Sequence, residues 1–201
     1  MLSATYAQRG EDTKLWSFFD KKDGHYIDIG ANDPVIDSVS KSFYDRGWSG
    51  INVEPLPFLA RELDIAQPRS RTICAGISDK PEIGVLHFDP NRTGLSTLSA
   101  KYGYDEKLEQ SLVIPLITLA ELCERYVRWP IDWLKIDVEG WETQVIRGGD
   151  WEKYRPSIVV VEATVPMTTI PSHEEWEPML TDADYEMIWN DGLNRFYKDA
   201  R

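Results

Sequence analysis

Short apolar runs alternate along the chain with stretches in which apolar residues recur every three or four positions. The short runs predict buried strands at residues 25–31, 51–54, 71–77, 132–138 and 157–162, with extra strands at 85–88 and 112–115. The periodic stretches predict helices at residues 11–19, 38–46, 59–66, 119–126 and 142–147. Strands that alternate with helices pair in parallel through right-handed crossovers, so we expect a mostly parallel sheet with helices on both faces.

The end of the chain has a different pattern. Two alternating runs at residues 185–189 and 194–198 flank the turn sequence Asn-Asp-Gly at 190–192, which predicts a hairpin with type I′ turn chemistry at one antiparallel edge. The polar loop at residues 89–104 has no regular pattern, and no repeat or linker divides the chain. We therefore expect a single domain over residues 1–201.

The charge of the chain excludes some partners. Its 201 residues carry 22 Lys and Arg against 34 Asp and Glu, a formal net charge of −12, without a basic run. Nucleic acid is therefore not expected as a partner. Cys74 and Cys123 fall in apolar patterns, which predicts small buried residues instead of a disulfide. We expect no membrane span and a cytoplasmic location, because no apolar segment reaches ~18 residues and the N-terminus lacks a signal-peptide pattern.

Two strand ends predict a nucleotide-binding edge. The run ending in Asp28, Ile29 and Gly30 places a glycine where a backbone can turn tightly and a ligand can approach. Glu54 ends the second strand, where a carboxylate can accept hydrogen bonds from both hydroxyls of a ribose. The sequence therefore predicts a ligand that contains adenosine.

The residues after Gly30 discriminate between cofactors. A nicotinamide dinucleotide needs further glycines for its pyrophosphate, whereas this chain supplies Ala31, Asn32 and the carboxylate of Asp33. S-adenosylmethionine carries no phosphate and has two cationic groups, which suits an acidic turn. It is the favoured cofactor. An NAD(P)-dependent oxidoreductase or epimerase on a Rossmann sheet is the alternative, and a non-catalytic cofactor-binding module is a third.

Six motifs, in order along nearly the whole chain, resemble the FkbM family of S-adenosylmethionine-dependent methyltransferases: QRGED (8–12), DIGANDP (28–34), NVEP (52–55), LKIDVEGWE (134–142), VEA (161–163) and DGLNRFY (191–197). The resemblance implies a Rossmann-like class I methyltransferase fold, with seven strands of which the last is antiparallel. It also implies O-methylation of a hydroxyl on a sugar, polysaccharide or related natural product. Relatives of this kind often act beside or within larger polysaccharide-building proteins.

Within these motifs the resemblance implies roles in cofactor binding. It assigns the methionine end of the cofactor to Asp28, Gly30 and Asn32, with Ala31 in the same loop, and the ribose to Glu54. It places Ser78 and Asp79 near the adenine, adds Asp137 to the cofactor-binding residues, and makes residues 8–12 an active-site lid that includes Gln8. The family's loop usually has more glycines than Gly30 alone, which leaves the contacts of residues 31–34 open.

Candidate catalytic residues follow the last two parallel strands. A methyl transfer from sulfonium needs in-line positioning and a base for the hydroxyl proton. Asp137, Glu139 and His173 are the candidates for that base. Each has a plainer interpretation, since Asp137 and Glu139 can serve the N-terminus of the next helix and His173 can be a surface residue. Asp137 with Glu162 could also hold a magnesium ion, although two carboxylates are few for this and no metal is favoured.

Overall fold

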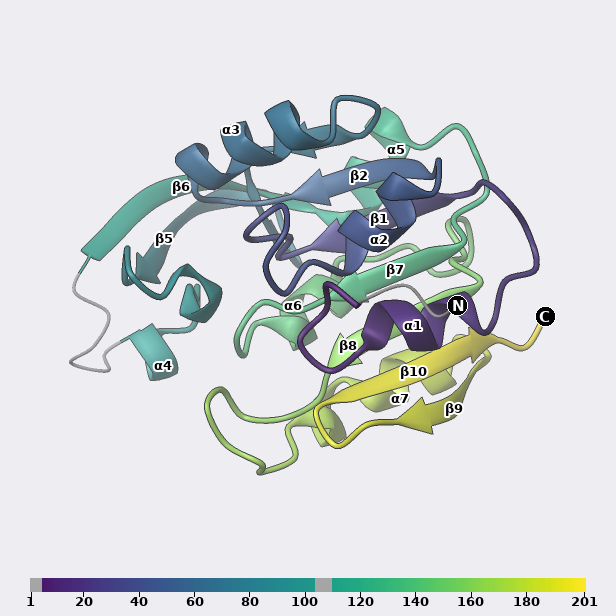
Figure 1. Ribbon diagram of the computed structural model, residues 1–201. Coiled ribbons are helices and arrows are strands. Elements are labelled where there is room, and N and C mark those ends of the chain that lie inside the picture. The colour runs from purple at the N-terminus through teal and green to yellow at the C-terminus, as the bar shows by residue number, and fades with distance from the viewer. Residues whose placement is uncertain (1–4, 104–109) are drawn as a thin grey trace.

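A seven-stranded sheet is the largest element of the computed structural model, which describes residues 5–103 and 110–201 (Figure 1). Its strands stand in the order β3-β2-β1-β7-β8-β10-β9. Their bounds are β1 (His25–Ile29), β2 (Ser49–Val53), β3 (Arg71–Ile73), β7 (Trp133–Ile136), β8 (Ile158–Glu162), β9 (Tyr185–Asn190) and β10 (Asn194–Asp199). The first five pair in parallel, and β10 is antiparallel to both of its neighbours. The expected sheet and its antiparallel edge hairpin are confirmed.

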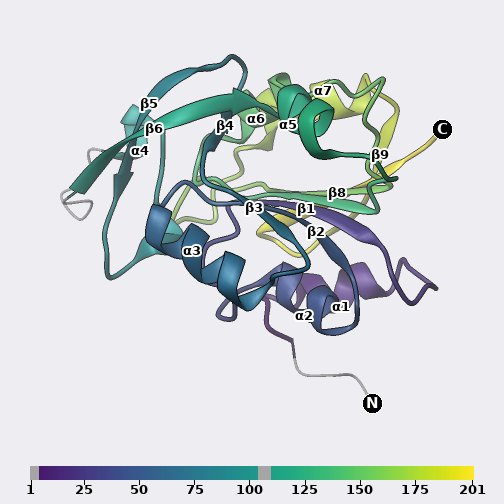
Figure 2. The same cartoon turned by 90° about the horizontal axis from the view of Figure 1, so that it is seen from above.

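Helices cover both faces of this sheet, as Figure 2 shows. On one face lie α1 (Glu11–Trp16), α2 (Val39–Asp45) and α3 (Pro57–Ala66). On the other lie α5 (Leu119–Tyr126), α6 (Glu142–Arg147) and α7 (Glu177–Thr181). Within the described ranges, none of the helices is both long and apolar enough to cross a membrane.

Alternate residues along the central strands pack in two separate cores. In β1, Ile27 and Ile29 pack in the cluster that contains Leu122 of α5, whereas Tyr26 packs in the cluster that contains Phe43 of α2 and Trp48. Because successive side chains of a strand point to opposite faces, a strand covered on both faces needs a continuous apolar run. Accordingly β8 has four apolar residues in succession, whereas Asp28 and Lys135 interrupt the apolar runs of β1 and β7.

A second, three-stranded sheet corrects two expectations. Its strands stand in the order β4 (Gly76–Ser78), β6 (Gln110–Thr118) and β5 (Glu82–Phe88). Along the chain, the 3-10 helix η1 (Thr93–Leu95) and the helix α4 (Ala100–Gly103) lie between β5 and β6. Residues 71–77 are thus two strands in different sheets, not one. Gly76 allows the change of sheet, because a Cβ there would lie 2.6 Å from Leu116 Cδ2. Cys74 lies at the break and is exposed, so the expectation that it is buried was wrong, while Cys123 is buried.

The hairpin turn is also not of type I′. That turn requires positive φ at two successive residues, and in the connection between β9 and β10 only Gly192 has one, at 90°. Asp191 stabilises the longer loop instead: its Oδ1 accepts the backbone N–H groups of Leu193 at 2.8 Å and Asn194 at 2.6 Å. An aspartate that bonds the backbone two residues on removes the need for a second positive φ.

Candidate active site

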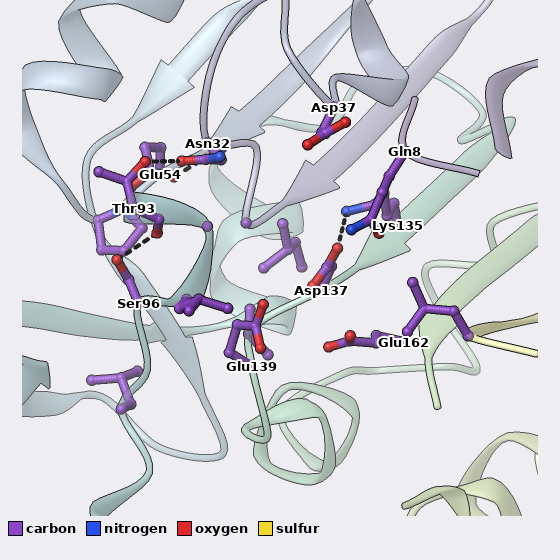
Figure 3. A pocket seen from close by; sticks show the side chains of 18 of the residues that line it. Gln8, Asn32, Asp37, Glu54, Thr93, Ser96, Lys135, Asp137, Glu139 and Glu162 are labelled. Atoms are coloured by element: carbon purple, nitrogen blue, oxygen red, sulfur yellow. Dashed lines mark hydrogen bonds and ion pairs between the residues drawn. The ribbon is translucent and has the colours of Figure 1, made fainter. Parts of the chain in front are cut away.

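A cavity of about 780 Å³ opens at the carboxyl ends of the central strands (Figure 3). The strand order reverses between β1 and β7, and ligands on open α/β sheets bind outside such a reversal. The walls come from the ends of β1, β2, β7 and β8, from the segment before α1, from the second sheet with residues 93–98, and from residues 164–170. A volume of this size accommodates a cofactor together with part of a second substrate.

Gly30 makes the tight turn that begins this site. Its φ is +80°, and a Cβ there would lie 1.8 Å from the backbone oxygen of Asp137. The loop after β1 therefore touches the end of β7 directly, which only glycine permits. The backbone N–H groups of Gly30 and Ala31 both donate to Val53 O, at 3.0 and 3.1 Å, so this loop is also fixed to β2.

Glu54 is a buried acceptor on the cavity wall. Its Oε2 accepts the N–H of Asn32 at 2.9 Å, and its Oε1 accepts the N–H of Leu56 at 2.8 Å. Burial raises the pKa of Glu54 to about 7, and the two N–H bonds only partly offset this. Each oxygen keeps a further lone pair for a donor in the cavity, which fits the two hydroxyls of a ribose.

Three carboxylates face one another on the opposite side of the cavity. Asp137 follows β7, Glu162 ends the neighbouring strand β8, and Glu139 adopts a left-handed φ of 53°. One oxygen of each lies within 4.8 Å of an oxygen of the other two, and Figure 3 shows the side chains turned toward each other. Burial, and then the charge of Asp137, raises the pKa of both Glu139 and Glu162. A negative charge on all three together is therefore costly without a cation.

Lys135 supplies one positive charge to this region. Its Nζ lies 2.8 Å from Asp137 Oδ2, and its pKa is raised because nearby carboxylates outweigh the opposing effect of burial. Asp28 stands opposite Lys135 in the β1–β7 register, is itself fully buried and does not line the cavity. Burial raises the pKa of Asp28, and the charge of Lys135 opposes this rise.

The segment before α1 reaches the cavity, as the motif at residues 8–12 suggested. Gln8, Arg9 and Glu11 line it. Glu11 also accepts Asn194 Nδ2 at 3.0 Å, which ties this segment to the start of β10. Motifs at the two ends of the chain thus meet at one wall.

The structure brings together some of the candidate residues and not others. The cavity is lined by Gln8, Gly30, Asn32, Glu54, Asp137, Glu139 and Glu162. Outside its lining lie Asp28, Ala31, Ser78, Asp79 and His173.

The distant candidates have other neighbours. The Ser78 hydroxyl donates to Asp79 Oδ1 at 3.3 Å, behind the cavity wall. His173 begins the short helix η2 (His173–Glu175), with its Nε2 3.8 Å from Glu177 Oε2. Sequence adjacency to a strand end therefore did not place these side chains in the site.

One wall of the cavity comes from residues that the sequence did not indicate. It is lined by Ala75, Gly76, Ile77, Leu86, residues 93–96 and Leu98. The Thr93 hydroxyl donates to Asn32 Oδ1 at 2.8 Å, and the Thr97 hydroxyl donates to the backbone oxygen of Glu139, also at 2.8 Å. The only signal was a cluster of Asn, Thr, Gly and Ser in a long polar loop.

This sheet order, with a glycine turn after the first strand and a ribose-type glutamate after the second, defines a class I S-adenosylmethionine-dependent methyltransferase. The chain belongs to the FkbM methyltransferase family, because residues 28–187 match the profile described as "Methyltransferase FkbM domain". The motifs at residues 8–12 and 191–197 lie outside the matched range.

Solved structures share the fold at low identity. A TehB-like S-adenosylmethionine-dependent methyltransferase from Corynebacterium glutamicum superposes with a TM-score of 0.50 and 7% identity, over 94% of this chain and 86% of that one. Fibrillarin of Aeropyrum pernix, in complex with natively bound S-adenosylmethionine, has a TM-score of 0.49 and 14% identity, over 88% of this chain and 66% of that one. A search of curated proteins found no match.

The site fits S-adenosylmethionine on its own chemistry. Glu54 offers a ribose two acceptor oxygens, and Gly30 leaves the backbone open where a side chain would fill the turn. The carboxylates on the far wall suit a ligand that carries a sulfonium and an ammonium group. The family and the site therefore agree on the methyl donor.

Proposed function

We propose that this methyltransferase transfers the methyl group to a hydroxyl of a sugar, polysaccharide or related natural product. The observation that carries the proposal is the wall formed by Asp137, Glu139 and Glu162. Their side chains present acceptor oxygens to the cavity, and the only side-chain partner among described residues within hydrogen-bond distance is Lys135, on Asp137. Hydroxyl groups donate to such oxygens, whereas phosphorylated or carboxylated acceptors would be repelled.

The rest of the acceptor region has the mixed character that a sugar ring needs. Residues 164–170 contribute Thr164, Thr168 and Thr169 to the lining together with apolar surface from Met167 and Ile170. The Thr164 hydroxyl oxygen is buried and the Thr168 hydroxyl bonds the backbone, which leaves Thr169 as the hydroxyl for a ligand. Hydroxyl side chains can donate to and accept from ring hydroxyls, while the apolar side chains can cover the C–H face of the ring. This segment therefore supports an uncharged, polyhydroxylated acceptor.

Each residue has a specific task in the proposed reaction. S-adenosylmethionine, when bound, supplies an electrophilic methyl group on a good leaving group. Glu54 holds the ribose, and Glu139 accepts the hydrogen bond and then the proton of the acceptor hydroxyl. The raised pKa of Glu139 makes it a stronger base than an exposed glutamate. Lys135 orients Asp137 beside it through the ion pair between Lys135 Nζ and Asp137 Oδ2.

The cellular location and the partners are proposals of the same kind. The family assignment sets aside a nicotinamide-dependent oxidoreductase and a non-catalytic module. We propose a cytoplasmic reaction, supported by two cysteines that are both free. The acidic balance of the chain argues against a nucleic-acid partner, and the enzyme would work beside or within a larger polysaccharide-building protein.

Methyl transfer from isotope-labelled S-adenosylmethionine to a panel of sugars and oligosaccharides tests the proposal. We expect a methyl ether as product, and a kcat at least about tenfold lower in Glu139→Gln with KM for the cofactor little changed. Glu186→Gln, on the exposed side of β9, is the matched control and should keep full activity. Transfer to amines or thiols but to no hydroxyl would refute the proposed acceptor class.

A further inference from the structure

The three carboxylates of the acceptor wall are arranged like the ligands of a single ion. Their nearest oxygens lie within 4.8 Å of one another. Three oxygens that are 4.8 Å from one another lie about 2.8 Å from their common centre, whereas an Mg–O bond is about 2.1 Å. A shift of each oxygen by about 0.7 Å or less through side-chain torsions would therefore bring all three into contact with one cation.

Glu162 provides a separate indication of a ligand. Its side chain is on the cavity wall, the residue is only 7% exposed, and its Oε2 has no hydrogen-bond partner among the described residues. Buried polar atoms are nearly always paired, so such an atom facing a cavity indicates a partner that enters from the cavity. The carboxyl group of Glu162 lies on the side of its side chain that faces Asp137 and Glu139 (Figure 3).

The backbone around the cluster is held in place independently of any ion. Glu142 Oε1 accepts the N–H groups of Val138 at 3.2 Å and Gly140 at 3.1 Å, which fixes the turn that carries Glu139. Glu142 is thereby a structural residue and not a fourth ligand. Arg9 and Lys135 are the cationic residues among the described ones that line the cavity, and Lys135 contacts only Asp137 of the three carboxylates.

We propose that Asp137, Glu139 and Glu162 form a site for a divalent cation of the magnesium or manganese type, next to the acceptor. Carboxylate oxygens are the ligands that these hard cations prefer. The site deepens the proposed function and rests on it. The cation binds the acceptor hydroxyl oxygen and favours its ionised form, and the released proton passes to the uncoordinated oxygen of Glu139.

Manganese binding tests the site without any acceptor. Protein dialysed against a chelator is titrated with Mn²⁺, and free Mn²⁺ is followed by its electron paramagnetic resonance signal. We expect a single saturable site that Mg²⁺ competes for. Glu162→Gln should weaken Mn²⁺ binding by roughly tenfold or more, because the site loses one of three charged ligands. Glu186→Gln, which removes an exposed carboxylate from β9, should bind Mn²⁺ as the wild type does.

The outcomes separate the cation site from the proposed acceptor. The absence of saturable Mn²⁺ binding, or equal binding by Glu162→Gln and the wild type, overturns the site. If Glu162→Gln does not fold by circular dichroism, Glu139→Gln replaces it, since Glu139 is only half-buried. Saturable binding without methylation of any hydroxyl compound keeps the site and refutes the acceptor. Full O-methylation after chelation, with no Mn²⁺ binding, refutes the cation site and supports the proposed acceptor.

Discussion

Replacing Glu54 tests the ribose contact most directly. The carboxylate is 4% exposed and already accepts two backbone N–H groups, so its place on the wall is defined before any ligand arrives. Loss of a hydrogen bond to a charged group costs about 1.5 to 3 kcal/mol. Glu54→Ala should therefore raise the Kd for S-adenosylmethionine by about 10- to 150-fold.

The raised pKa of Glu54 adds a pH dependence to this prediction. With a pKa of about 7, the carboxyl is about one-tenth ionised at pH 6 and about nine-tenths ionised at pH 8. The ionised form is the better acceptor for ribose hydroxyls, so wild-type affinity should rise by about tenfold between these pH values. Glu54→Gln removes the titration and should flatten that part of the profile.

The contribution of Glu54 to folding stability changes with pH in the opposite direction to its contribution to cofactor binding. Because burial raises the pKa of Glu54 above its unfolded value near 4.5, its contribution to stability is fully present below that value. It is lost as the pH rises through about 7. Both Glu54 variants also disturb the N–H groups of Asn32 and Leu56, so thermal unfolding must be measured alongside binding.

Isothermal titration calorimetry with S-adenosylmethionine from pH 6 to pH 8 measures these effects. Subtracting the Glu54→Gln profile from the wild-type profile removes the titration of the ligand's own amino group. Glu62→Gln, an exposed carboxylate on α3, is the control for a general change in charge. Equal affinity in the wild type and Glu54→Ala, with both folded, would refute the ribose role.

Three further changes probe the rest of the site. Gly30→Ala should abolish cofactor binding in calorimetry and lower the free energy of unfolding in urea by more than Gly47→Ala. Both positions have positive φ, but only at Gly30 would a Cβ meet backbone. Lys135→Met should destabilise the protein by up to about 3 kcal/mol, because it removes the cation beside half-buried Asp137 and fully buried Asp28, and an unchanged urea midpoint would contradict the pairing. His173→Ala should change kcat by less than about twofold, since the ring lies outside the cavity lining; a large loss would restore it as a base.

Local pattern predicted the parts of the fold that depend on nearest neighbours along the chain. Apolar runs such as residues 157–162 indicate a strand buried on both faces, and β8 is buried over its whole length. The same pattern misled at residues 71–77, because Cys74 and Gly76 look strand-like although the chain changes sheets between them. Which sheet a strand joins depends on partners far away in sequence, here β2 for one half and β6 for the other.

The candidate site also contains some residues that the sequence could identify and others whose position only the packing decided. Gly30 and Glu54 could be identified from the sequence because each stands at a strand end with its chemistry set by residue type. The family resemblance assigned Asp28 to the cofactor as well. Asp28 is buried and lies outside the cavity lining, although its register neighbour Lys135 lines the cavity. A side chain one residue earlier or later on a strand points to the other face, and only packing decides what covers that face.

The sequence by itself determined the kind of protein: a mostly parallel sheet with a glycine and a glutamate at the ends of its first two strands, a methyl donor as cofactor, and carboxylates at the ends of two later strands. Those properties follow from residue type and local order along the chain. Only the tertiary structure decided that Glu139 joins Asp137 and Glu162 within 4.8 Å, and that residues 93–98 close the cavity. Distances of this kind arise from strand register and loop packing, which bring together residues that no local pattern connects.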